Sequence, residues 1–102
     1  DAIQCYNKVL KIIPNEASAR IKKALALSAL GRNEEAVECC DKLIAVNPEH
    51  LRVWLVKADI LEQMFKRPDA IVCYQKFISL APHDLIRDIE YARNRIKELE
   101  EH

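Results

Sequence analysis

The sequence predicts an all-α protein, a right-handed superhelical solenoid of antiparallel helix pairs with six helices. Three observations predict this fold: a phrase that recurs at a fixed period, apolar side chains spaced three and four apart, and a proline at the same place in each recurrence. The chain has 102 residues and half of them are apolar, so it has enough material for one compact unit with a core.

The recurring phrase is DAIQCYNKVLKIIP from residue 1, EAVECCDKLIAVNP from residue 35 and DAIVCYQKFISLAP from residue 69. Apolar positions within it have helical spacing, so each copy predicts a helix. Each copy closes on a proline, which lacks an amide hydrogen and moves the preceding residue out of the helical region. The helices are therefore expected to end at Ile13, Asn47 and Ala81.

Two further helices are predicted between the copies, over residues 17–30 and 51–64, where apolar residues again recur at helical spacing. Gly31 is expected to end the first of them in the left-handed conformation, with Asn33 capping the next helix. Phe65 occupies the place of Gly31 one repeat later, so that turn is expected to be built differently, as a distorted corner. Pro68 suits the first turn of the helix that follows.

Helix pairs that repeat at a period of about 34 positions, with small residues at fixed places and a closing proline, resemble the tetratricopeptide repeat (TPR) family. The unit that starts at Leu51 supplies the family's aromatic, small and proline positions as Trp54, Ala58, Ala70, Tyr74 and Pro82. The unit that starts at Ala17 departs from the pattern, with Arg20 and Cys40 in place of the two aromatic residues. The resemblance covers the whole chain.

The repeat frame predicts a single TPR-like domain fragment over residues 1–102. Residues 1–13 form the second helix of a repeat whose first helix is absent, residues 17–50 and 51–84 form two repeats, and residues 85–101 form a capping helix. The first helix then lacks one neighbour, and its end is expected to fray or to pair with a second copy. The residues expected to mediate such self-association are Ile3, Tyr6, Val9, Leu10 and Ile13.

The TPR resemblance implies a concave wall made by the first helix of each pair, wide enough for an extended peptide or a helix. The inward positions give an apolar floor with a charged rim, although such a stripe is also compatible with packing between helices. The predicted peptide-binding groove consists of Ser18, Ile21, Lys22, Leu25, Arg52, Leu55, Val56, Asp59, Gln63, Ile89, Glu90 and Arg93.

Some members of the family grip the acidic C-terminal peptide of heat-shock chaperones with lysine and asparagine side chains. The matching positions here hold Ile21, Leu25, Val56, Ile86 and Glu90, so that form of binding is not expected. The predicted function is a scaffold for protein interaction that holds an amphipathic or apolar peptide or helix. The alternatives are a self-associating segment of a longer repeat array and, more remotely, an RNA-binding helical repeat.

The sequence predicts no catalytic site, no metal site and no cofactor. Cys5, Cys39 and Cys73 recur on successive second helices about 8–10 Å apart, too far for a disulfide or a shared zinc ion. The cysteines are expected to be small apolar fillers in a reducing compartment. The histidines and the carboxylate pairs, including Asp59 and Glu62, are expected to be solvated.

The balance of charge disfavours two classes of partner. Sixteen basic residues balance sixteen acidic ones, which argues against RNA and against anionic membranes. No apolar run approaches the length of about 20 residues that a membrane span requires. A cytoplasmic protein that binds a protein or peptide partner, with a possible homodimer through the N-terminal end, is the resulting expectation.

Overall fold

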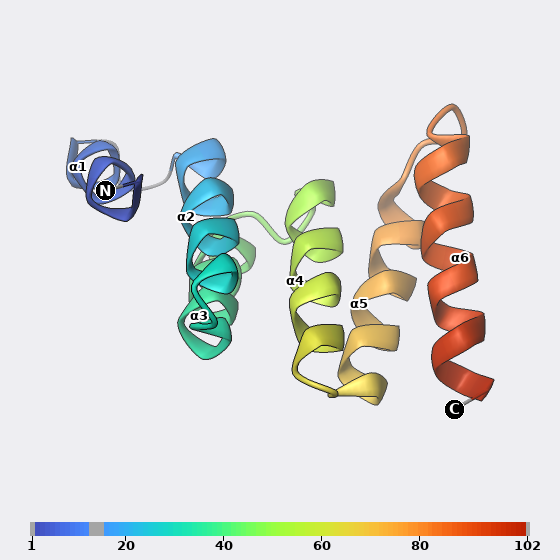
Figure 1. The fold of residues 1–102 in the computed structure, drawn as a ribbon. Coiled ribbons are helices and arrows are strands. Elements are labelled where there is room, and N and C mark those ends of the chain that lie inside the picture. Colours follow the sequence, from blue (N-terminus) through green and yellow to red (C-terminus); the bar gives the residue numbers. More distant parts are fainter. Residues whose placement is uncertain (1, 13–15, 102) are drawn as a thin grey trace.

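The computed structural model describes residues 2–12 and 16–101, and all regular structure in them is helical (Figure 1). Residue 1, residues 13–15 and residue 102 lie outside the described residues, so the expected helix end at Ile13 is not addressed. The all-α fold with six helices is confirmed for the described residues. The helices are α1 (Ala2–Ile12), α2 (Ala17–Ala29), α3 (Asn33–Val46), α4 (Leu51–Gln63), α5 (Arg67–Leu80) and α6 (Ile86–Glu101).

The helices are stacked in a row from α1 at one end to α6 at the other, and α4, α5 and α6 alternate in direction (Figure 1). Each helix packs mainly against the helices that precede and follow it in the sequence, and α2 also contacts α4. The molecule measures 41 × 29 × 21 Å and is therefore elongated along the row. Because α2 touches α4 across α3, the first helices of the two pairs form a common wall.

Buried alanines at one repeat spacing allow this close stacking. Ala24, Ala58 and Ala92 occupy the same position in successive repeats, on the first helix of each unit, and each is almost completely buried. A larger side chain at these places would hold the helix backbones apart. The core forms two clusters around them. The N-terminal core cluster is centred on Leu27, Cys40 and Val53, and the C-terminal core cluster is centred on Leu61, Tyr74 and Phe77.

The turns within the two complete pairs have the same backbone hydrogen bonds, displaced by one repeat. In the first turn Gly31 N–H donates to Ser28 O at 2.9 Å and Arg32 N–H donates to Leu27 O at 2.9 Å, which is a Schellman motif. Gly31 has a φ of +79°, as predicted. The predicted cap at Asn33 is wrong, because α3 already includes Asn33 and its cap is Arg32. The side chain of Asn33 instead accepts a hydrogen bond from Ser28 Oγ at 2.8 Å.

The expectation of a distorted corner at Phe65 is also wrong. Phe65 N–H donates to Glu62 O at 3.0 Å and Lys66 N–H donates to Leu61 O at 3.0 Å, the same pattern as in the preceding pair. Phe65 achieves it by adopting a φ of +60°, the left-handed region that disfavours a side chain. The backbone geometry of the repeat therefore outweighs the conformational preference of the residue. Pro68 lies in the first turn of α5, as predicted.

The Phe65→Gly variant should be more stable than the native chain by about 0.5–1 kcal/mol, because glycine adopts a positive φ without strain. The phenylalanine side chain is 84% exposed, so its removal forfeits little packing. The matched change is Gly31→Ala in the preceding turn. It should cost about 1 kcal/mol although an added Cβ meets no atom within 4 Å. Urea unfolding monitored by circular dichroism measures both, and a loss of stability in Phe65→Gly would contradict the strain argument.

The connections between repeats are fixed by side chains near each proline. The helices α3 and α5 end at Val46 and Leu80, so the predicted exits at Asn47 and Ala81 are confirmed. Trp54 Nε1 donates to Pro48 O at 2.8 Å, which ties α4 to the turn before it. His50 Nδ1 accepts from Val53 N–H at 3.4 Å and caps α4. These contacts set the start of α4 and hence the first residues of the wall that it shares with α2.

Candidate functional site

A hollow of about 430 Å³ lies between the N-terminal half of α2 and the start of α4, and we call it the α2–α4 hollow. Its floor is apolar, with the buried Ile21 beside Leu25, which is 43% exposed. Exposed apolar side chains in a concavity are the usual lining of a ligand site. The residues that line it are Glu16, Ala17, Ser18, Ile21, Lys22, Leu25, His50 and Arg52.

The rim of the α2–α4 hollow is positively charged. Lys22 and Arg52 are both exposed, and neither takes part in an ion pair within the described part of the chain. Glu16 is the one acidic residue of the lining, and its carboxylate accepts from Ser18 N–H at 2.9 Å as the cap of α2. The hollow therefore keeps two cations available to a ligand.

A second hollow of about 500 Å³ lies where the C-terminal half of α4 meets α6, and we call it the α4–α6 hollow. Asp59, Glu62, Gln63, Tyr91 and Arg95 line it. Arg52 and Asp59 are seven residues apart on α4, so they lie on the same face of that helix. The two hollows therefore border the same stripe of α4.

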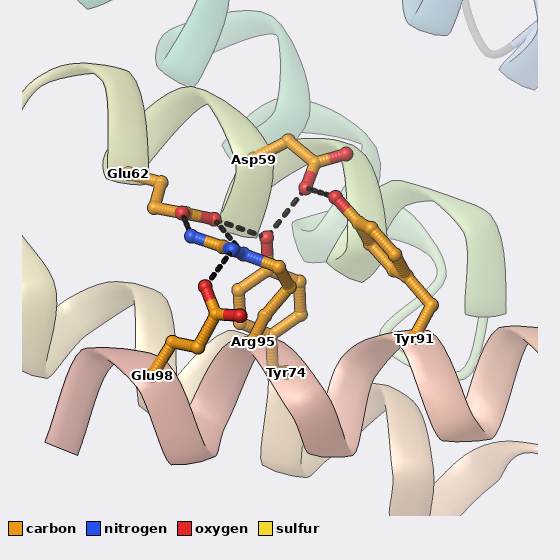
Figure 2. Close-up of polar contacts among 6 residues, drawn as sticks. All are labelled: Asp59, Glu62, Tyr74, Tyr91, Arg95 and Glu98. Atoms are coloured by element: carbon orange, nitrogen blue, oxygen red, sulfur yellow. Dashed lines mark hydrogen bonds and ion pairs between the residues drawn. The ribbon is translucent and has the colours of Figure 1, made fainter. Parts of the chain in front are cut away.

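Four of the five residues that line the α4–α6 hollow, all but Gln63, belong to a polar cluster that joins three helices (Figure 2). The Tyr74 hydroxyl of α5 lies 2.5 Å from Asp59 Oδ1 and 2.7 Å from Glu62 Oε2, both on α4. From α6, the Tyr91 hydroxyl donates to Asp59 Oδ1 at 2.9 Å. Arg95, also on α6, pairs through two nitrogens with Glu62 and donates to Glu98 at 2.6 Å. The cluster therefore fixes α6 against the last complete pair.

The environment of Tyr74 keeps its hydroxyl protonated. The residue is completely buried, and its ring meets that of Tyr91 edge-on with centroids 6.2 Å apart. Burial raises the pKa of Tyr74 well above its usual value, and the adjacent Asp59 carboxylate raises it further. A protonated hydroxyl between two carboxylates acts as a hydrogen-bond donor, so the cluster serves to hold α4, α5 and α6 together.

The prediction that Asp59 and Glu62 are solvated is wrong. The Glu62 side chain is only 19% exposed and Asp59 is half-buried, because α6 covers this part of α4. Sequence reasoning also missed Tyr91 and Arg95, which lie four residues apart on α6 and therefore on one face. The available signal was a tyrosine and an arginine at (i, i+4) spacing on the predicted capping helix.

The predicted groove residues fall into three groups: those that line a hollow, those that belong to the core, and those on α6. Five of them, Ser18, Ile21, Lys22, Leu25 and Arg52, line the α2–α4 hollow, while Asp59 and Gln63 line the α4–α6 hollow. Val56 is buried in the N-terminal core cluster, and Leu55 is half-buried against the C-terminal one. On α6, Ile89 is half-buried, and Glu90 and Arg93 are exposed outside both hollows.

Four of the five residues predicted for self-association lie on α1, which has no fully buried residue among Ala2–Ile12. Ile3, Tyr6 and Leu10 are half-buried, and Ile3 packs against the N-terminal core cluster. Val9 is exposed, and Ile13 lies outside the described residues. The helix packs chiefly on α2, so part of its apolar surface is uncovered.

Three of the four cysteines are buried fillers, as expected, but Cys5 is exposed. The expectation fails for Cys5 because α1 packs chiefly on α2, whereas α3 and α5 lie between two helices each. Burial raises the pKa of Cys40 to about 12, so its thiol is protonated and unreactive at neutral pH. Within residues 2–12 and 16–101, no group of three or more metal-ligating side chains is assembled.

No helix in the described residues is long and apolar enough to cross a membrane. This finding agrees with the absence of a long apolar run in the sequence.

Comparisons with known proteins agree on the repeat fold. The first TPR of Spaghetti (RPAP3), solved with HSP90 peptide SRMEEVD bound, superimposes with a TM-score of 0.83 at 19% identity, covering 97% of this chain and 75% of that one. The Sgt2 TPR domain from Aspergillus fumigatus gives a TM-score of 0.77 at 24% identity, covering 98% of this chain and 69% of that one. No curated protein sequence matches the chain at a significant level.

A family model described as the N-terminal TPR repeats region of Psidin matches residues 1–85, which include both complete helix pairs. The chain therefore belongs to the family of the Psidin N-terminal TPR repeats region.

Proposed function

We propose that this chain is a scaffold for protein interaction that binds a peptide or helix of its partner along the concave wall formed by α2 and α4. The observation that carries the proposal is the α2–α4 hollow, where Leu25 is 43% exposed on an apolar floor beneath two cations. Burying apolar surface of a ligand in such a concavity is favourable by about 25 cal/mol of free energy per Å² removed from water.

Two further observations support binding over catalysis. Three polar groups of the wall have structural roles: Glu16 and His50 cap helices, and Glu62 is paired with Arg95. A similar fold, the first TPR of Spaghetti, holds an HSP90 peptide. The proposal takes from this neighbour only that the fold is able to bind a peptide, since its identity to this chain is 19%.

The Leu25→Glu variant should lose at least tenfold in affinity for peptides selected from a random displayed library against the native chain. A glutamate at this place would put a charge against the apolar part of the ligand, and that desolvation costs more than the free energy, about 1.4 kcal/mol, that corresponds to a tenfold change. Leu30→Glu is the matched control, because Leu30 is exposed at the end of α2 outside the hollow. Fluorescence anisotropy gives the affinities.

Changes in the amide chemical shifts of the chain on adding a selected peptide locate its binding site. Shifts concentrated on α2 and α4 support the proposal. Equal binding by the native chain and Leu25→Glu, with shifts on the outer faces of α3 and α5, would refute it. Circular dichroism must show the same helix content in all variants.

A second candidate function is self-association through α1. Ile12 is 81% exposed and Val9 is 39% exposed, so α1 carries apolar surface that its contact with α2 leaves open. Multi-angle light scattering over a concentration series should then show a dimer that Val9→Glu converts to a monomer. A constant monomer mass for the native chain at all concentrations would eliminate this candidate.

A further inference from the structure

We propose that the groove selects a dipolar segment: an acidic residue beside an aliphatic one over the α2–α4 hollow, and a basic residue about three positions along over the α4–α6 hollow. The proposal rests on the proposed function and specifies the ligand of that same site. It commits to a protein segment in extended conformation, and charge complementarity along the wall is its basis.

The acidic position follows from the α2–α4 hollow. Lys22 and Arg52 approach it from two different helices and have no ion-pair partner among the residues that the structure describes. The N-termini of α2 and α4 border the same hollow, and the helix dipole adds positive potential there. Two side-chain cations and two helix N-termini therefore outweigh Glu16, the one acidic residue of the lining, and the net positive potential attracts a carboxylate of the ligand.

The aliphatic position follows from the floor between these cations. Ile21 and Leu25 lie four residues apart on α2 and face the hollow together. Since the cations lie on the rim and the apolar atoms on the floor, a ligand that satisfies both presents an aliphatic side chain next to an acidic one.

The basic position follows from the α4–α6 hollow. Arg95 is occupied by Glu62 and Glu98, so its charge is more than balanced by its two neighbours. Both tyrosine hydroxyls contact the same oxygen of Asp59, and Figure 2 shows the other carboxylate oxygen pointing away from them. This oxygen is the acceptor for a lysine or arginine of the ligand, on a surface with an excess of negative charge.

Helix geometry sets the spacing between the two charged positions. Arg52 and Asp59 lie on one face of α4, and seven residues at about 1.5 Å each separate them by about 10 Å. An extended peptide advances about 3.3 Å per residue, so it covers this distance in about three residues. A helical ligand would need about twice as many residues, which distinguishes the two conformations.

The test uses three synthetic peptides of equal length with capped termini. All contain the same central leucines and small polar residues; one has glutamates at one end and lysines at the other, one has glutamates at both ends, and one has lysines at both ends. Binding to the full chain is measured by fluorescence anisotropy at low ionic strength. The dipolar peptide should bind at least fivefold more tightly than either of the others, and the advantage should shrink in high salt.

A charge-reversed chain provides the complementary measurement. Lys22→Glu combined with Arg52→Glu should reverse the preference, so that the peptide with lysines at both ends binds most tightly. The matched control is Lys42→Glu combined with Lys76→Glu, which makes the same change in net charge at exposed positions on α3 and α5. This control should leave the order of the three peptides unchanged.

The outcomes separate this inference from the proposed function. If all three peptides bind alike and Leu25→Glu abolishes binding of each, the groove is a peptide site and the dipolar specificity is refuted. If none binds the native chain better than the Leu25→Glu variant, the dipolar ligand is refuted. If library selection also yields no groove ligand, the proposed function fails with it.

Discussion

Tyr74→Ala should lower the free energy of unfolding by about 3–5 kcal/mol, the range for removing a fully buried aromatic ring. The ring fills the space between α4, α5 and α6, and its hydroxyl is the donor between Asp59 and Glu62. Its loss creates a cavity and also removes the hydrogen bond that the single hydroxyl proton makes to a partly buried carboxylate. Typical domains are stable by only about 5–15 kcal/mol, so the variant should be near the limit of folding. Urea denaturation followed by circular dichroism measures the change.

Tyr74→Phe is the matched control, since it removes the hydroxyl and keeps the ring. It should cost about 1–2 kcal/mol, the loss of one hydrogen bond to a carboxylate, because Asp59 keeps its bond from Tyr91 and Glu62 keeps its pair with Arg95. If the alanine and phenylalanine variants lose the same amount, ring packing contributes nothing and the cavity argument is wrong.

Leu27→Ala should lower the free energy of unfolding by about 2–5 kcal/mol, because it also leaves a cavity, here at the other end of the core. Leu27 is 1% exposed and belongs to the cluster that joins α2, α3 and α4. Leu30→Ala is the control with identical chemistry, because Leu30 is 64% exposed and should change stability by no more than about 0.5 kcal/mol. Thermal unfolding of both variants provides the measurement, and equal losses would show that burial does not determine the cost.

The helices and their ends were predictable because their signals are local. A proline at Pro48 or Pro82 restricts the residue before it whatever the rest of the chain does. The turn at Phe65 was predicted wrongly for the opposite reason. Its left-handed conformation is imposed by the packing of α4 against α5, which outweighs a local cost of about 1–2 kcal/mol.

The candidate site was predictable only in part. Residues on the α2 face, such as Lys22 and Leu25, were identified because the repeat frame fixes which side of that helix is concave. Leu55 and Val56 are adjacent on α4 and point about 100° apart, so helical periodicity alone does not decide which of them is buried. The contacts of Tyr74 with Asp59 and Glu62 depend on how α6 docks, and no local pattern specifies that.

The stacking of each helix mainly on its sequence neighbours makes protection against hydrogen exchange uneven along the row. A helix with one neighbour opens without disturbing the others, whereas α2, α3, α4 and α5 open only if two interfaces separate. Amide protons of α1 should therefore exchange by local opening. Those of the central helices should exchange only through events close to global unfolding. The helix α6 also has one main neighbour, but it buries Ala92 and Leu99 and is paired with α4 through Arg95, whereas α1 has no fully buried residue, so the molecule frays from α1 inward.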